Sequence, residues 1–294
     1  MKKTMATCAG TLLLAFFATV STAAEDKAPD FVELQAFARL ANASYADTAV
    51  IKNELAAQHY ELAKQIDDLR YAVSGFVGIN DATKTQVIVV RGTSNLENAL
   101  VDVTLQLLPD KKTTVKLHQG FSQSASNFYQ QVLPLLHKDY RIISVGHSLG
   151  GAIANVLAMY LDEDKFNVEK VVTFGQPKVT NVAGARKYAH LDVTRVVTPK
   201  DVVPLVPPLD PMDLMKLDIY WHMGKEIVLL DSNGYAVLEG TQSMMRAARF
   251  TNVAPDESNL QHHMMNEYLR RLADKIPTAK QIPYAIEIKL FDGL

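Results

Sequence analysis

The five residues Gly146 to Gly150, Gly-His-Ser-Leu-Gly, constrain the fold of this chain more than any other feature. An apolar run from Arg141 to Val145 precedes them, and apolar residues recur at helical spacing from Gly151 to Leu161. These flanks predict a buried strand, a sharp turn and a helix in immediate succession. Because the turn is tight and its neighbours are small, we expect Ser148 to be strained and exposed above a sheet.

Strand patterns and helix patterns alternate along the middle of the chain. Strands are predicted at Tyr71 to Ile79, Thr85 to Val90, Ile142 to Val145, Val171 to Phe174, Val193 to Val197, Ile227 to Leu230 and Tyr235 to Leu238. Helices are predicted at Gly120 to His137, Ala152 to Asp162 and Ala183 to His190. This alternation predicts an α/β fold with a mostly parallel central sheet that is covered by helices on both faces.

The two ends of the chain lack the alternation of strand and helix patterns that the middle shows. Helical patterns at Asp30 to Ala46 and at Lys52 to Asp68 predict an N-terminal helical flank. In the C-terminal tail, Pro277 to Leu294, the run Ala285 to Phe291 is compatible with either an edge strand or a strap. No internal repeat or low-complexity linker interrupts the sequence, so a single domain is expected.

The first 24 residues have the pattern of an export signal. Lys2 and Lys3 precede an apolar stretch from Leu12 to Val20, and small residues follow it up to Ala24. The stretch is shorter than the roughly 20 residues that span a bilayer. We therefore expect residues 1–24 to be a cleaved signal peptide, residues 25–294 to form one domain, and the protein to be secreted or periplasmic. Cleavage would also remove Cys8, the single cysteine of the chain.

The charge balance excludes some partners. The formal net charge is -2 and becomes more negative once Lys2 and Lys3 are removed. Without a long basic run, the chain is not expected to bind nucleic acid. The same balance gives no attraction to an anionic membrane surface, so any contact with lipid would be apolar.

A serine hydroxyl needs a histidine to accept its proton and a carboxylate to orient that histidine. In folds with this turn the chain order is Ser, then Asp or Glu, then His. Asp201 follows the predicted strand Val193 to Val197 and is the first choice for the acid, with Asp210, Asp213 and Asp218 as alternatives. The histidines downstream of Ser148 are His190, His222, His262 and His263. The backbone N–H of Leu149 is expected to face the reacting carbonyl from a helix N-terminus.

Several further motifs resemble those of the class 3 lipases, the fungal-type triacylglycerol lipases of the α/β-hydrolase superfamily. The resemblance covers roughly Phe76 to Leu269. The matching segments are Val90 to Thr93 with Asn98 and Asp102, His118 to Phe121, Gly146 to Gly150, Phe174 to Pro177, Asp201 to Pro204, Tyr220 to Gly224 and His263 to Tyr268. This resemblance implies the α/β-hydrolase fold.

The resemblance also implies roles for individual residues. It makes Ser148 the nucleophile, Asp201 the orienting acid and His263 the base, because His263 to Tyr268 looks like the family's His-x-Met-x-x-Tyr. It implies that Thr93 joins Leu149 in the oxyanion hole. It gives no catalytic role to the other motif histidines, which are His118, His147 and His222.

The segment from Ser94 to Asp110 carries apolar residues at helical intervals, and the resemblance implies a lid there. Ala99 stands where the family commonly has a tryptophan, which removes an aromatic side chain that inserts into lipid interfaces. Because this aromatic side chain is missing, the sequence does not predict activation of the enzyme at a lipid–water interface.

The leading hypothesis is an exported ester hydrolase that cleaves lipid acyl esters, with no metal and no organic cofactor. One alternative keeps the chemistry and changes the substrate to phospholipids, cleaved in the manner of a phospholipase A1, or to short soluble esters. A peptidase or amidase is a second alternative, and a non-catalytic lipid-binding domain is a third. The partner expected in each lipase reading is a lipid or ester substrate, possibly presented at an interface.

Overall fold

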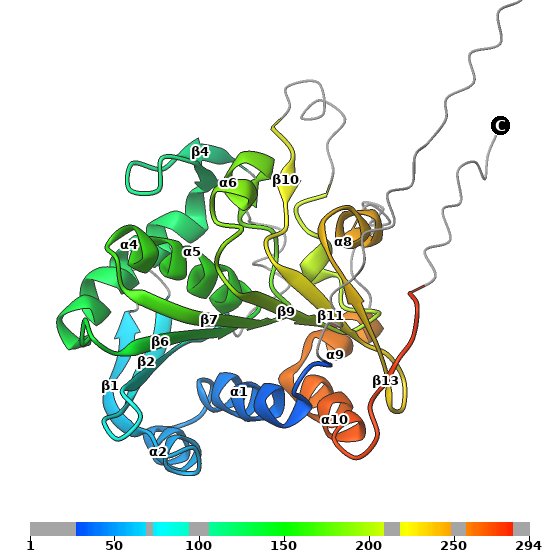
Figure 1. Ribbon diagram of the computed structural model, residues 1–294, viewed down its shortest axis with the longest axis horizontal. Coiled ribbons are helices and arrows are strands. Elements are labelled where there is room, and N and C mark those ends of the chain that lie inside the picture. The colour runs from blue at the N-terminus through cyan, green and yellow to red at the C-terminus, as the bar shows by residue number, and fades with distance from the viewer. Residues whose placement is uncertain (1–27, 69–72, 94–105, 209–217, 248–256, 285–294) are drawn as a thin grey trace, which may run out of the picture.

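The computed structural model describes residues 28–68, 73–93, 106–208, 218–247 and 257–284 (Figure 1). Within these ranges one sheet has the strand order β1-β2-β3-β6-β7-β9-β11-β12-β13. Its strands are β1 (Glu61–Asp68), β2 (Val73–Asn80), β3 (Thr85–Val90), β6 (Arg141–His147), β7 (Asn167–Phe174), β9 (Val193–Val197), β11 (Lys225–Leu229), β12 (Gly234–Leu238) and β13 (Lys280–Gln281).

The centre of the sheet is parallel. β3, β6, β7, β9 and β11 pair in parallel in that order. β1 and β2 add an antiparallel edge on one side, and β12 pairs antiparallel with β11 through the predicted hairpin. The central strands are buried along most of their length, as expected for a parallel sheet that helices cover on both faces.

Helices cover both faces of the sheet (Figure 1). On one face lie α4 (Gln119–Val132), α5 (Leu149–Glu163) and α6 (Val182–Lys187), and on the other lie α1 (Phe31–Ala43), α2 (Thr48–Ala56) and α10 (Met265–Lys275). Two separate hydrophobic clusters fill the two interfaces. α5 is buried from Gly150 to Leu161 because α4 covers the side that faces away from the sheet. The predicted α/β-hydrolase fold is confirmed.

One predicted helix is wrong in its second half. Lys52 to Asp68 was expected to be helical, but α2 ends at Ala56 and Glu61–Asp68 forms strand β1. His59, with φ of 63°, turns the chain out of the helix. The residues that follow pair with β2 along the whole strand, and this pairing outweighs the helix propensity of their Glu, Leu, Ala and Lys side chains.

A second, four-stranded antiparallel sheet was not predicted. Its order is β10-β8-β5-β4, with β4 (Leu107–Pro109), β5 (Lys116–His118), β8 (Thr180–Asn181) and β10 (Tyr220–Trp221). Each strand has two or three residues, which is too short for an alternating pattern to be detected. The remaining helices are η1 (Leu133–Leu135), η2 (Val203–Leu205), α8 (Gly240–Ala247) and α9 (Glu257–His263).

Three expectations fall on residues outside the described ranges: the signal peptide over residues 1–24, most of the lid over Ser94 to Asp110, and the strand or strap at Ala285 to Phe291. In the described ranges, no helix combines the length and the apolar character needed to cross a membrane.

Candidate active site

Ser148 occupies the predicted turn between β6 and α5. Its φ of 58° and ψ of -131° are unusual for a residue with a side chain, which confirms a strained turn. Glycine is needed on both sides: a Cβ on Gly146 would lie 2.4 Å from the carbonyl oxygen of Gly150, and one on Gly150 would lie 2.3 Å from that of Val90. Gly146 and Gly150 are therefore required at these positions, because α5 begins in direct contact with strands β6 and β3.

The side chain of Ser148 is not exposed, contrary to expectation. Only 1% of the residue is accessible. The loop after β3 packs directly on it, since a Cβ built on Gly92 would lie 2.9 Å from Ser148 Cβ. On the other side, the Ser148 N–H donates to the carbonyl oxygen of Phe174 at 2.8 Å. Neighbouring strand ends thus enclose the serine.

Asp201 lies in the loop after β9 and is completely buried. The backbone N–H of Val203 donates to its Oδ1 at 2.9 Å, while Tyr268 donates to its Oδ2 at 2.5 Å. Burial raises the pKa of Asp201, but the charge and hydrogen bond of His263 and the other two donors outweigh burial and hold the pKa below its usual value. The carboxylate is therefore held ionised in the interior.

His263 is the last residue of α9 and is 2% exposed. Its Nδ1 lies 2.8 Å from Asp201 Oδ2. Because an ionised carboxylate only accepts hydrogen bonds, Nδ1 carries the hydrogen and Nε2 is the free base. Within the described residues, neither His263 Nε2 nor Ser148 Oγ has a hydrogen-bond partner, although both atoms are buried.

Gly175 allows Asp201, His263 and Ser148 to converge. It follows Phe174, the residue that accepts the Ser148 N–H, and it has a φ of +61°. A Cβ at this position would lie 2.8 Å from Asp201 Oδ2 and 2.8 Å from His263 Cε1. Any side chain here would therefore collide with the pair that the hydrogen bond joins.

The two residues expected to form an oxyanion hole lie on either side of the serine. Thr93 comes directly after Gly92, which contacts Ser148. Leu149 is the first residue of α5, where a backbone N–H has no acceptor inside the helix. The helix dipole adds partial positive charge at this end. Both positions suit an N–H donor to a negatively charged oxygen.

The chain is similar to known lipases. Residues 87–210, less than half of the chain, match the family model described as lipase (class 3). A lipase of Rhizomucor miehei is 26% identical over 220 residues, and the match covers 70% of this chain but only 59% of that protein.

The chain is also similar to two triacylglycerol lipases. A secreted alkaline triacylglycerol lipase of Penicillium cyclopium is 29% identical over 146 residues, covering 46% of this chain and 50% of that protein. The solved structure of a triacylglycerol lipase whose catalytic centre is formed by a serine protease triad matches with a TM-score of 0.58 and 28% identity. That match covers 68% of this chain and 80% of the other.

The structure places the other candidates away from Ser148 and Asp201. Three histidines have different partners: His222 Nε2 lies 2.7 Å from the carbonyl oxygen of Pro204, His190 Nε2 lies 3.1 Å from Asp162, and His262 Nδ1 lies 3.9 Å from Glu267. Asp218 bonds to Lys116 and Asn181. The remaining alternatives for the acid, Asp210 and Asp213, lie outside the described residues.

Two tyrosines belong to the site although sequence reasoning assigned neither a role. Tyr268, in α10, contacts Asp201, and the only signal for it was the motif that begins at His263. Tyr45, in the turn after α1, contacts the residue next to the serine. Nothing in the sequence indicated Tyr45, because it precedes the region of resemblance.

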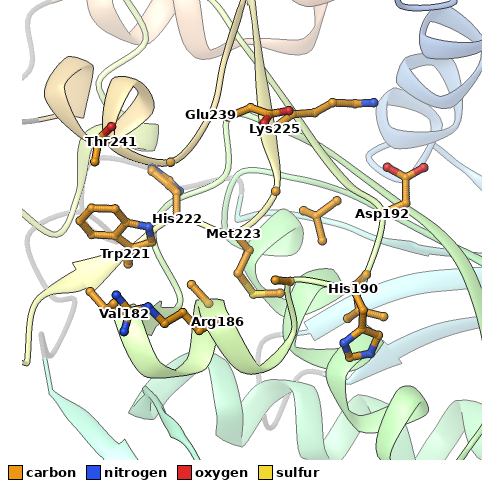
Figure 2. Close-up of a pocket in the computed structure, with 16 residues that line it drawn as sticks. Val182, Arg186, His190, Asp192, Trp221, His222, Met223, Lys225, Glu239 and Thr241 are labelled. Carbon is orange, nitrogen blue, oxygen red and sulfur yellow. The ribbon is translucent and has the colours of Figure 1, made fainter. Parts of the chain in front are cut away.

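A cavity of about 770 Å³ lies away from Ser148, Asp201 and His263. Its walls come from α6, β10 and the start of α8. Figure 2 shows Trp221 and Arg186 on one side of it and His190 and Asp192 on the other. Because Val193 and Lys225 begin β9 and β11, the cavity is at the amino ends of these strands, whereas Asp201 follows a carboxyl end. His190 and His222, two of the histidines considered for the base, line it, whereas Thr93 and Leu149 do not.

No metal centre was found in the part of the chain that the structure describes: no three His, Cys, Asp or Glu side chains there are grouped to hold an ion.

Proposed function

We propose that this protein hydrolyses acyl esters of lipids, with Ser148 as the nucleophile, His263 as the general base and Asp201 as the acid that orients the base. The observation that carries the proposal is the hydrogen bond of 2.8 Å from His263 Nδ1 to Asp201 Oδ2, which leaves Nε2, buried and without a partner among the described residues, to act as the base for the strained serine. The similarity to a triacylglycerol lipase with a serine protease triad supports the same assignment.

In the acylation step, Ser148 Oγ attacks the ester carbonyl carbon while its proton moves to His263 Nε2. The resulting imidazolium is stabilised by Asp201, which the Tyr268 and Val203 donors hold in its ionised form. When the carbon–oxygen bond to the alcohol breaks, His263 returns that proton to the leaving oxygen. The acyl group then remains on Ser148 as an ester.

In the deacylation step, water attacks the acyl-enzyme and gives its proton to His263. Collapse of the second tetrahedral intermediate releases the fatty acid and returns the proton to Ser148. Every proton and every bond is accounted for by Ser148, His263, the ester and water, so the proposed reaction uses neither a metal nor an organic cofactor.

The oxyanion of both tetrahedral intermediates is assigned to the backbone N–H groups of Thr93 and Leu149. Leu149 supplies the helix N-terminus and Thr93 supplies the loop that packs on Ser148. Losing one such donor costs on the order of 100-fold to 1000-fold in kcat. These two residues are therefore proposed as the largest electrostatic contribution to the rate.

We also propose that the protein is exported. The pattern of residues 1–24 supports this, and so does the similarity to a lipase of Penicillium cyclopium that is named as secreted. In that setting, the expected substrate is an acyl glyceride presented at a lipid–water interface.

The test is a series of hydrolysis rates, from dissolved short-chain esters to emulsified long-chain glycerides and phospholipid vesicles. Ser148→Ala is measured beside Ser144→Ala as a matched control. Ser144 lies in β6, the strand that leads to Ser148, and its buried hydroxyl donates to the carbonyl oxygen of Ala154. We expect Ser148→Ala to abolish turnover and Ser144→Ala to retain it.

The substrate profile separates the alternatives. Turnover that rises on emulsified glycerides supports the lipase, and a preference for phospholipid supports the phospholipase A1 reading. Turnover confined to dissolved short esters indicates a carboxylesterase. If no substrate is cleaved in a Ser148-dependent manner, the enzyme proposal is wrong and a non-catalytic lipid-binding domain takes its place.

A further inference from the structure

A chain of three hydrogen bonds connects the turn after α1 with both sides of the candidate site. The backbone N–H of Gly92 donates to the hydroxyl oxygen of Tyr45 at 3.0 Å. That hydroxyl lies 2.7 Å from His147 Nδ1, and His147 Nε2 lies 2.8 Å from the carbonyl oxygen of His263. These hydrogen bonds thus link Gly92, which precedes Thr93, and His147, which precedes Ser148, to the backbone of His263.

The donors and acceptors in this chain can be arranged in one way. The carbonyl oxygen of His263 only accepts hydrogen bonds, so His147 Nε2 carries a hydrogen and donates it. In a neutral imidazole the other ring nitrogen, Nδ1, then carries no hydrogen and accepts from the Tyr45 hydroxyl, whose oxygen accepts from Gly92. The Tyr45 hydroxyl therefore favours the tautomer of His147 that holds the backbone of His263.

The ionisation of both side chains is consistent with this arrangement. Burial raises the pKa of Tyr45 far above its usual value, which keeps its hydroxyl hydrogen in place. Burial, followed by the nearby charge of His263, lowers the pKa of His147 to about 3. His147 is therefore neutral throughout the range in which a histidine base works.

A neutral His147 matters because its ring lies against that of His263, with the ring centroids 4.6 Å apart. During the proposed reaction His263 becomes positively charged. A second positive charge at this separation, in the interior, would oppose that protonation. The tautomer that Tyr45 imposes thus supports His263 through its backbone without adding a competing charge.

We propose that Tyr45, acting through His147, is a positioning residue for the ester hydrolysis proposed above. Its hydroxyl sets the spacing between three groups that must act together: the oxyanion loop at Gly92 and Thr93, the nucleophile that follows His147, and the base His263. The inference rests on the proposed function, because it assigns Tyr45 no contact with the substrate.

The test compares Tyr45→Phe with the unchanged protein on a dissolved ester. The variant keeps the ring and removes the hydroxyl that joins Gly92 to His147. Since small misplacements of reacting groups cost up to about 100-fold, we expect kcat to fall by about 10-fold to 100-fold while KM changes less than about twofold. Tyr188→Phe is the control, because it also removes a tyrosine hydroxyl from a hydrogen bond, here to Glu163 at the end of α5 farthest from Ser148.

A spectroscopic measurement separates positioning from general loss of stability. In the unchanged protein, the ring nitrogens of His147 should show Nε2 protonated and Nδ1 unprotonated by ¹⁵N NMR near neutral pH. In Tyr45→Phe this tautomer should no longer be uniform, whereas Tyr188→Phe should retain it.

The outcomes distinguish the two proposals. If turnover depends on Ser148 but Tyr45→Phe keeps kcat within about twofold, or loses no more than Tyr188→Phe, the positioning role is overturned and the proposed function stands. A protonated Nδ1 on His147 in the unchanged protein overturns it as well. If the unchanged protein shows no Ser148-dependent turnover, the proposed function fails and this inference fails with it.

Discussion

Tyr268 donates its hydroxyl hydrogen to Asp201 Oδ2 at 2.5 Å, and the same oxygen lies 2.8 Å from His263 Nδ1. One carboxylate oxygen therefore serves the base and a tyrosine at once. Burial, followed by the charge of Asp201, raises the pKa of Tyr268 well above its usual value, so the hydroxyl remains a donor.

Removing this donor should weaken the support of the base. In Tyr268→Phe, Asp201 loses one of its donors and its pKa rises, because fewer hydrogen bonds then favour the charged form. A hydrogen bond to a charged group is worth about 1.5 kcal/mol or more, so we expect kcat to fall about tenfold. Steady-state kinetics on a dissolved ester measure this, with Tyr160→Phe as the remote control. Unchanged kcat in Tyr268→Phe would show that the shared oxygen is unimportant.

Gly175 should not accept a methyl group. Its φ is +61°, and a Cβ would lie within 2.9 Å of both Asp201 and His263. We expect Gly175→Ala to lower kcat more than 100-fold, because the hydrogen-bonded pair must separate, and to lower the free energy of unfolding by about 1–3 kcal/mol.

The control for this prediction is Gly120→Ala. Gly120 lies in α4, and the nearest atom to an added Cβ there is at an ordinary 3.5 Å. Activity should be retained, and stability should be equal or slightly higher. Equal activity in Gly175→Ala and Gly120→Ala would contradict the collision.

Stability should fall as the pH drops from 7.5 to 5.0. Burial lowers the pKa of His118 to about 4 and that of His147 to about 3, and burial, followed by the charge of Arg195, lowers that of His222 well below 6.5. Between these values and 6.5 the unfolded chain binds more protons than the folded one, so acid favours unfolding. Each such histidine costs about 2 kcal/mol at pH 5.0.

Urea unfolding at the two pH values measures this effect. His118→Gln should reduce the difference between them by about 2 kcal/mol, whereas the exposed His59→Gln should leave it unchanged. Equal unfolding free energies at pH 7.5 and 5.0 in the unchanged protein would refute the prediction.

Glu226 should be essential for folding. It is 1% exposed and pairs with Arg195 at 3.0 Å and with Arg246, which are buried as well. In Glu226→Gln both cations lose their counter-charge, so we expect the free energy of unfolding to fall by about 3–5 kcal/mol. Denaturant unfolding measures this, with the exposed Glu239→Gln expected to stay within about 0.5 kcal/mol. If the free energy of unfolding of Glu226→Gln also changed by no more than about 0.5 kcal/mol, the charges of Arg195 and Arg246 would have to be compensated by other groups.

The sheet and its helices were predictable because their signals are local. Buried parallel strands are continuous apolar runs, and Ser148 and Asp201 were located as the residues that follow two of them. Strand β1 was not predictable, since its residues favour helix and only pairing with β2 makes them a strand. The short strands of the second sheet carry no periodicity at all.

The rest of the site depends on contacts between distant residues. Four histidines follow Ser148, and only the resemblance to the class 3 lipases singled out His263. The structure brings His263 and Asp201 together, while their catalytic roles stay proposals. Tyr45 lies far from every motif in the sequence and reaches His147 only because α1 packs on the sheet beside the loop after β3.

The packing of α1 against α10 has a consequence for synthesis of the chain. α10 begins two residues after His263, so the segment that carries the proposed base docks on the first helix that the structure describes. A nascent chain released up to α5 contains Ser148 but not His263. The proposed hydrolase is thus expected to stay inert until α10, together with the His263 that precedes it, docks on α1.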